Sequence, residues 1–272
     1  MILIVICHVV AGLSGNSYFS HDDYVFRYYL PSNDISHVLL SYLHQMGLLG
    51  NTVFFTVSAW FLLDNSRIKA EKIMGILLDR EIVSVIFLLA GLIITSGGID
   101  RSLAVKMLFP HTFRLFWYLT CYILFYLIHP ALNLVIKSMS QRSHLIFVVI
   151  SSSLFIFYSF FIHWYYSNVL ISWVVLYFLI GYIKKYIPDR LRSRTTVNVF
   201  LLVAGFAGSI LIIIISNIVC LNVESLSEIG LSYFDEISVW NPFHIMISIA
   251  LMNIALKLPP QNIRFINYAS SL

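Results

Sequence analysis

Charged residues are scarce in this chain of 272 residues, where Asp, Glu, Lys and Arg make up 11% and hydrophobic residues 59%. A soluble globular domain carries roughly 25% charged residues. A chain with less than half that share has too little polar surface to cover a water-soluble domain of this size. The scarcity excludes a water-soluble enzyme and a disordered chain. It predicts an all-α fold, a polytopic membrane helix bundle.

Cysteine is nearly absent as well, with only Cys7, Cys121 and Cys220 in the chain. No two of them have the spacing of metal ligands or of a disulfide framework, so we expect neither a metal site nor a disulfide scaffold. The net charge of +4 is not a nucleic-acid signature, because in a membrane protein the placement of the charges matters more than their sum. We therefore expect a lipid bilayer as partner, no nucleic acid and no bound cofactor.

Long apolar runs are what the sequence has in abundance. A helix needs about 20 mostly apolar residues to cross a bilayer, and eight segments are candidates: 1–13, 44–63, 81–97, 115–136, 145–163, 168–183, 197–220 and 240–258. Eight such spans leave little chain for a soluble domain. We therefore predict a single integral membrane domain over residues 1–272, and its short first and last segments indicate that it is incomplete at both ends.

The basic residues predict how these spans are oriented. Thirteen of the 17 Lys and Arg residues lie in alternate connections, namely 64–80, 137–144, 184–196 and 259–272, together with Lys257. Basic residues favour the cytoplasmic side of a membrane. The pattern predicts a multi-pass protein of the cell membrane with both ends of this chain in the cytoplasm.

Two histidines, His8 and His129, have neighbours that suggest a role inside a predicted span, whereas His163 and His244 lie at span ends, where the membrane interface tolerates them. His8 follows the apolar run Ile2–Cys7, and an ionisable residue in that position is costly enough to suggest function. Apolar surroundings favour the neutral imidazole, which can accept a proton, although a packing histidine bonded to a neighbouring span is the alternative. His129 directly precedes Pro130. Because proline frees a backbone carbonyl one turn back, we expect His129 to have a structural role.

Two arginines lie near predicted span ends. Arg114 stands close to Trp117 at the outer end of the fourth span, where an arginine beside aromatic rings can hold a sugar or an anion. Arg80 closes the cytoplasmic loop before the third span. It either meets a phosphate-bearing donor or only contributes to the positive-inside pattern. Small and hydroxyl residues at near-helical spacing in Asn51–Leu63, Ser58 among them, predict a close-packing face between spans.

Four segments follow one another in a characteristic order. The first closes on His8, and the second, Asn51–Leu63, has an asparagine, a pair of phenylalanines and then a serine before an aromatic residue. The third, Phe116–Asn133, combines Trp, Tyr and Pro with a final Leu-Asn, and the fourth is Tyr177–Tyr182, Tyr-Phe-Leu-Ile-Gly-Tyr. In this order, over almost the whole chain, these segments resemble the acyltransferase-3 family of integral membrane acyltransferases, in particular its polysaccharide O-acetyltransferase branch.

The chain departs from the family pattern in several places. An arginine that usually stands about eleven positions before the histidine would precede Met1. Ala59 replaces a glycine, and Val83 stands where a second arginine follows the position of Arg80. The family also continues beyond the segment 267–271 into a further span. Both ends of the chain therefore resemble a truncated family member.

The resemblance implies transfer of an acyl group, usually acetyl, from cytoplasmic acyl-CoA to a sugar hydroxyl of an exported or cell-surface bacterial polysaccharide. It implies that His8 is either the catalytic base or a covalent acyl carrier. It also implies the expected partners, which are acyl-CoA, a carbohydrate acceptor and the polysaccharide-synthesis machinery. The expected substrate-contacting residues are Arg80 for the CoA phosphates, Arg114 and Trp117 for the acceptor sugar, and Asn51 and Ser58 on a face that packs near His8.

Two other kinds of protein remain open at this stage. A transporter or lipid-linked sugar flippase would also be polytopic with rare intramembrane polar groups, but it often shows inverted repeats and broken spans in matching halves. The sequence has no such matched pair. The other alternative is an inactive remnant of an acyltransferase, which the missing arginine and the abrupt ends favour.

Overall fold

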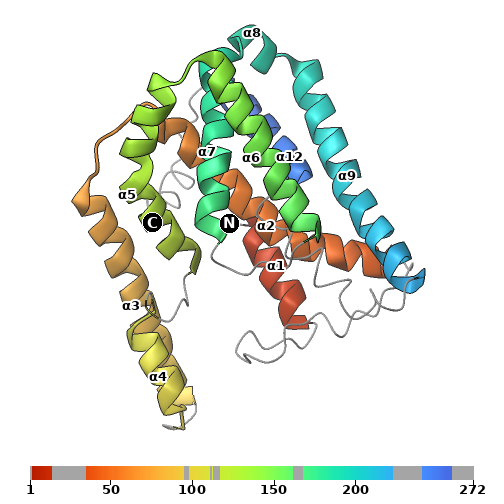
Figure 1. Ribbon diagram of the computed structural model, residues 1–272. Helices are drawn as coiled ribbons and strands as arrows, with labels where there is room; N and C mark the ends of the chain where they lie inside the picture. Colours follow the sequence, from red (N-terminus) through yellow and green to blue (C-terminus); the bar gives the residue numbers. More distant parts are fainter. Residues whose placement is uncertain are drawn as a thin grey trace.

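The computed structural model describes residues 2–13, 35–94, 98–110, 112, 117–161, 168–222 and 241–258. The helices of this described part are α1 (Ile2–Leu13), α2 (Ile35–Leu62), α3 (Ala70–Ile94), α4 (Arg101–Leu108), α5 (Trp117–Ser138), α6 (Gln141–Phe161), α7 (Asn168–Tyr186), α8 (Asp189–Arg192), α9 (Thr195–Asn222) and α12 (Pro242–Ala255). No strand occurs among these residues. The expected all-α helix bundle is confirmed (Figure 1).

Each predicted span falls on one helix, but two helices begin well before their spans. Helix α2 begins at Ile35 rather than at residue 44, and α3 begins at Ala70 rather than at residue 81. Hydropathy marks the stretch that lipid favours, whereas the helical backbone continues through good helix formers such as Glu71 and Lys72. The prediction that Arg80 belongs to a loop over residues 64–80 was therefore wrong, because Arg80 lies inside α3.

The outer surface of the bundle is strongly apolar. Three helices of the described part are long and apolar enough to cross a membrane: Trp117–Ser138, Val169–Tyr186 and Thr195–Ile215. Large apolar side chains point outward, among them Phe200 on α9 with 67% of its surface exposed and Ile94 on α3 with 82%. Soluble proteins rarely expose apolar surface on this scale, whereas hydrocarbon chains accommodate it. The described helices thus have the surface of a membrane bundle.

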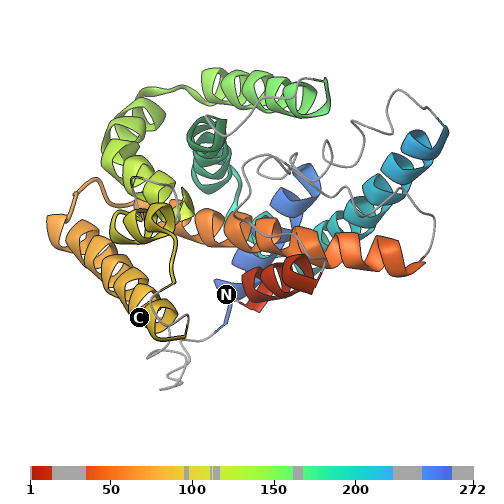
Figure 2. The same ribbon diagram turned by 90° about the horizontal axis from the view of Figure 1, so that it is seen from below.

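Helix α2 runs through the middle of the bundle. It contacts α1, α7, α9 and α12, and the view from below shows it with α5, α6 and α7 on one side and α1 on the other (Figure 2). Helices α3 and α4 pack against each other at the edge. Because α2 is central, its side chains make up much of the interior of the bundle.

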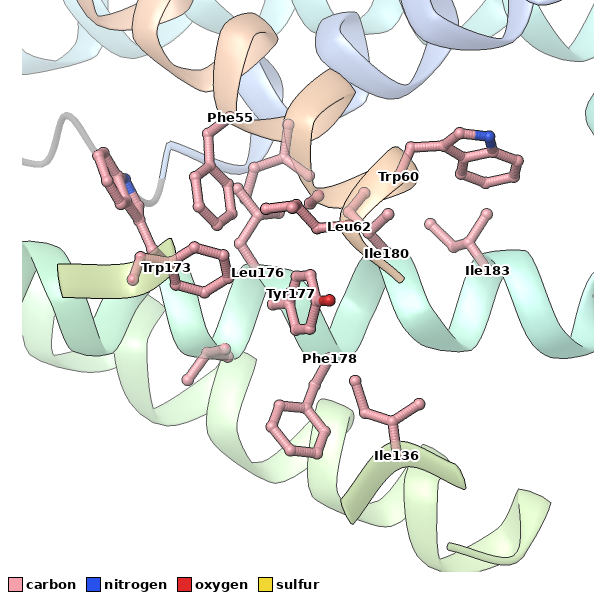
Figure 3. Close-up of a cluster of buried hydrophobic side chains, with 14 of the residues drawn as sticks. Phe55, Trp60, Leu62, Ile136, Trp173, Leu176, Tyr177, Phe178, Ile180 and Ile183 are labelled. Atoms are coloured by element: carbon pink, nitrogen blue, oxygen red, sulfur yellow. The ribbon is translucent and has the colours of Figure 1, made fainter. Parts of the chain in front are cut away.

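An aromatic core joins α2 to α5 and α7. Phe55 is fully buried, stacks on Trp173 at 4.7 Å between ring centroids, and meets Phe125 edge-on at 4.8 Å. Tyr177 is also fully buried below α2 (Figure 3). Large aromatic rings bury much apolar surface and prefer such geometries. The core fixes the rotation of α2 and therefore the direction of its polar residues.

Candidate functional site

Helix α1 packs closely against α2 at two glycines. A Cβ atom added to Gly47 would lie 2.7 Å from the Sγ of Cys7, and one added to Gly50 would lie 3.0 Å from the Cγ1 of Ile4. Residue numbers rise along α1 as they fall along α2, so the two helices are antiparallel. Small residues allow backbones to approach this closely in a membrane. This contact fixes α1 at a defined height on α2.

His8 lies within α1, directly after Cys7. Because Cys7 faces Gly47, the antiparallel register places position 8 beside the part of α2 that precedes Gly47. That part contains two polar residues, His44, which is half-buried, and Gln45, of which 3% is exposed. The register thus brings the helix of His8 against the polar residues of α2.

The sequence interpretation missed His44. Yet His44 precedes Asn51 by seven residues and Ser58 by fourteen, so the three share one stripe of α2. Helical periodicity could therefore have found it. His44 is the first residue of the predicted span 44–63.

Tyr118, the chain neighbour of Trp117, links the start of α5 to Asn51. The hydroxyl of Tyr118 donates a hydrogen bond to the backbone oxygen of Asn51 at 3.2 Å, and its ring meets that of Trp117 edge-on at 5.8 Å. Tyr118 also contacts Trp173, with 5.0 Å between ring centroids. The start of α5 is thereby fixed to α2 one residue beyond Gly50, near the contact with α1.

The remaining expected site residues lie elsewhere. Ser58 is half-buried and lies seven residues beyond Asn51, about 10 Å further along α2. Arg80 is half-buried in α3 and forms no ion pair within the described ranges. Arg114 lies outside the described residues. The structure thus joins the start of α5 to Asn51 through Tyr118. It places His44 two turns before Asn51, on the part of α2 that packs against α1, and Ser58 two turns beyond Asn51, away from that contact.

His129 has the expected structural role. Its Nδ1 donates a hydrogen bond to the backbone oxygen of Tyr126, which is the carbonyl that Pro130 cannot serve because proline has no N–H. The Nε2 of His129 lies 2.9 Å from the backbone oxygen of Asn65 in the α2–α3 connection. The side chain is fully buried. His129 therefore supplies the donor that α5 lacks at Pro130 and links α5 to the α2–α3 connection.

Asn133 completes this polar network. Its amide nitrogen donates to the backbone oxygen of Leu62 at 2.9 Å and to Ser66 Oγ at 3.2 Å, and its Oδ1 accepts from the Tyr177 hydroxyl at 2.6 Å. Asn133 is 1% exposed. Its hydrogen-bonding groups are occupied by α2, α7 and the α2–α3 connection. Asn133, the last residue of the segment Phe116–Asn133, therefore has a structural role.

Basic residues gather where α2, α5 and α7 end. The Lys184 ammonium donates to the backbone oxygen of Trp60 and to Asp64, both at 2.6 Å, and lies 4.7 Å from the centre of the Trp60 ring. Arg192 lies 4.6 Å from the same ring. Lys185 donates to the backbone oxygens of Ile136 and Met139. Lysines favour helix C-termini because the last carbonyls lack partners there.

Arg192 is a partly buried cation of this basic end. Burial lowers the pKa of the Arg192 guanidinium from its ordinary value, which is high enough for the group to stay cationic. The basic connections after α2, α5 and α7 lie at one end of the bundle, uppermost in Figure 1. Within the described residues, no group of three His, Cys, Asp or Glu side chains could hold a metal ion.

Comparison with known proteins adds one finding. The model of an acyltransferase domain, that of the acyltransferase-3 family, matches residues 1–265. No curated protein and no solved structure showed significant similarity to the chain. The matched range includes the α1–α2 contact and each of the expected site residues.

Proposed function

Since the chain belongs to the acyltransferase-3 family, it is a membrane acyltransferase, and we propose that it transfers an acetyl group from acetyl-CoA to a hydroxyl of an exported or cell-surface polysaccharide. The observation that supports this most directly is the close contact of α1 with Gly47 and Gly50. It holds the helix that carries His8 against the part of α2 that contains His44 and Gln45.

The chemistry requires a base in the membrane. A sugar hydroxyl is a poor nucleophile and needs a group that accepts its proton. In our proposal the His8 imidazole accepts that proton as the hydroxyl oxygen bonds to the thioester carbonyl carbon. The carbon–sulfur bond then breaks, and the leaving CoA thiolate takes the proton back from the imidazolium. The products are the acetylated sugar and free CoA thiol.

The two substrates approach from opposite ends. We place the basic end of the bundle, with Lys184, Lys185 and Arg192, in the cytoplasm, as the positive-inside rule predicts. In this arrangement eight helices cross the cell membrane and the CoA phosphates arrive at the basic end, with Arg80 further along α3. The acceptor sugar then meets Arg114 and Trp117 on the outer side.

The test is the O-acetyl content of surface polysaccharide, measured by NMR in a strain that lacks the gene and in complemented strains. We expect the acetyl signal to disappear with the gene and to return with the wild-type chain but not with His8→Ala. The matched control is Val9→Ala on the same helix, whose side chain is 54% exposed and should be dispensable. Full restoration by His8→Ala would refute the role of His8. An unchanged acetyl signal in the deletion strain would favour a flippase or a remnant.

A further inference from the structure

His44 of α2 lies at the height of His8. Cys7 faces Gly47, whereas Ile4 faces Gly50, so three residues forward along α1 correspond to three residues back along α2. One further residue along α1 places position 8 level with position 46. His44 is two residues away, which is about 3 Å along the helix axis.

The two positions also lie on the same side of their helices. On α2, Met46 packs toward Ile247 of α12, in a cluster that also includes Leu3 of α1. Each helical residue turns by about 100°, so His44 is turned about 160° from Met46, away from α12. On α1, position 8 is turned about 140° from Leu3, again away from α12. Both positions therefore lie on the side of the α1–α2 pair that faces away from α12.

The surroundings suit a functional histidine. His44 is half-buried, so part of its side chain is covered by neighbouring residues and part is exposed. Tyr118 anchors α5 to Asn51, two turns from His44 on the same stripe of α2. Among the described helices around this part of α2, the titratable residues are Cys7 and His8 on α1, His37 and Tyr42 on α2, Tyr118 on α5, Cys220 on α9 and His244 on α12.

We propose that His44 is a positioning residue for His8: it accepts a hydrogen bond from the His8 imidazole and holds that ring in the orientation that takes the proton from the sugar hydroxyl. This inference rests on the proposed acyl transfer. A base that is oriented by a third group is the recurring arrangement in such catalysis. His44 neither gains nor loses a proton in the step. The hydroxyl proton passes to His8 and from there to the CoA thiolate.

The placement is tested by cross-linking, which needs no activity. In a chain whose three native cysteines are replaced by alanine, the pair His8→Cys and His44→Cys should form a disulfide on mild oxidation in membranes. The control pair, His8→Cys with His244→Cys, should not, because position 8 of α1 is turned away from the side on which α12 packs. No disulfide in the first pair, or an equal yield in both pairs, would overturn the placement.

The role is tested kinetically with acetyl-CoA and polysaccharide from the deletion strain. We expect His44→Phe, which keeps a ring but no nitrogen, to lower kcat roughly 100-fold or more while the KM for acetyl-CoA changes less than about twofold. His44→Gln, which keeps a hydrogen-bonding group, should recover part of that loss. The acid limb of the kcat/KM profile should move to lower pH in His44→Phe, because protonated His8 then loses a hydrogen-bond acceptor.

The control is the same replacement at His244, which is 2% exposed on α12. His244→Phe can lower the amount of folded protein but should leave the pH profile of the remaining enzyme unchanged. A wild-type kcat and pH profile in His44→Phe would overturn the positioning role. If the wild-type chain transfers no acetyl while the cross-link forms, the acyl-transfer proposal fails, and the catalytic role of His44 fails with it.

Discussion

The hydrogen bond between Tyr177 and Asn133 should be among the strongest polar links between helices in the bundle. The Tyr177 hydroxyl donates to Asn133 Oδ1 at 2.6 Å, and the two residues are 0% and 1% exposed. Either Asn133→Leu or Tyr177→Phe removes the bond and leaves the other partner's polar atom buried. The double variant removes both polar atoms together. A double-mutant cycle on these two residues therefore isolates their interaction.

The expected magnitude follows from burial. An unpaired buried polar group costs about 1–3 kcal/mol, whereas replacing both partners by apolar groups can be nearly neutral. Interhelical hydrogen bonds in membranes couple by about 0.6 kcal/mol on average and rarely exceed about 1.7 kcal/mol. Because neither side chain reaches solvent, we expect a coupling of about 1–1.5 kcal/mol. Asn133→Leu should be the more harmful single variant, since it also leaves the Leu62 carbonyl without its donor.

The assay is reversible unfolding of the protein in detergent micelles or lipid discs, with the free energy of unfolding compared among the four chains. The double variant should be less destabilised than the sum of the single variants. Additivity within about 0.3–0.5 kcal/mol, the range found for independent sites, would refute the argument that this buried bond couples Tyr177 and Asn133. Tyr177→Phe alone should keep the protein in the membrane and serves as the folding control.

Three further results are expected. Gly47→Ala should destabilise the chain by about 1–3 kcal/mol through overpacking against α1 and lower acyl transfer; wild-type thermal stability would contradict the close contact. Lys184→Met should lower the free energy of unfolding more than Asp64→Asn does, because it also removes the contacts of Lys184 with Trp60. The Asp64 side chain is 69% exposed, and surface ion pairs contribute only about 0–1 kcal/mol. Equal losses would argue against the Trp60 contacts. In a cysteine-free chain, an impermeant thiol reagent added to whole cells should label Arg101→Cys but not Arg190→Cys, and the reverse result would invert the orientation.

Helix existence followed from the sequence more reliably than helix extent. The eight apolar runs predict helices because hydropathy measures the free energy of burial in lipid. The same measure cannot detect that α2 begins at Ile35 or that α3 begins at Ala70, since helical hydrogen bonding continues beyond the bilayer. Arg80 was accordingly assigned to a loop, although it lies well inside α3. Helices α4 and α8 were not predicted because they are too short to form a span.

Local chemistry made the role of His129 predictable. Proline at position 130 leaves a carbonyl without a donor whatever the rest of the fold does, and the histidine beside it is the nearest group that can replace the missing N–H. The role of Asn133 could not be obtained in this way. Its partners Leu62 and Tyr177 are distant in sequence, so only the packing of α2, α5 and α7 brings them together.

By itself, the sequence determined the class of protein, an all-α membrane bundle, because composition and apolar run length depend on no tertiary contact. It also determined the resemblance that the acyltransferase-3 match later confirmed. The tertiary structure alone decided which residues meet. The glycines at 47 and 50 set the height of α1, and that height places His44 rather than Ser58 beside the helix of His8. The register between two helices depends on how the shapes of their two surfaces fit together. The sequence specifies the residues on each surface but does not show how the surfaces fit.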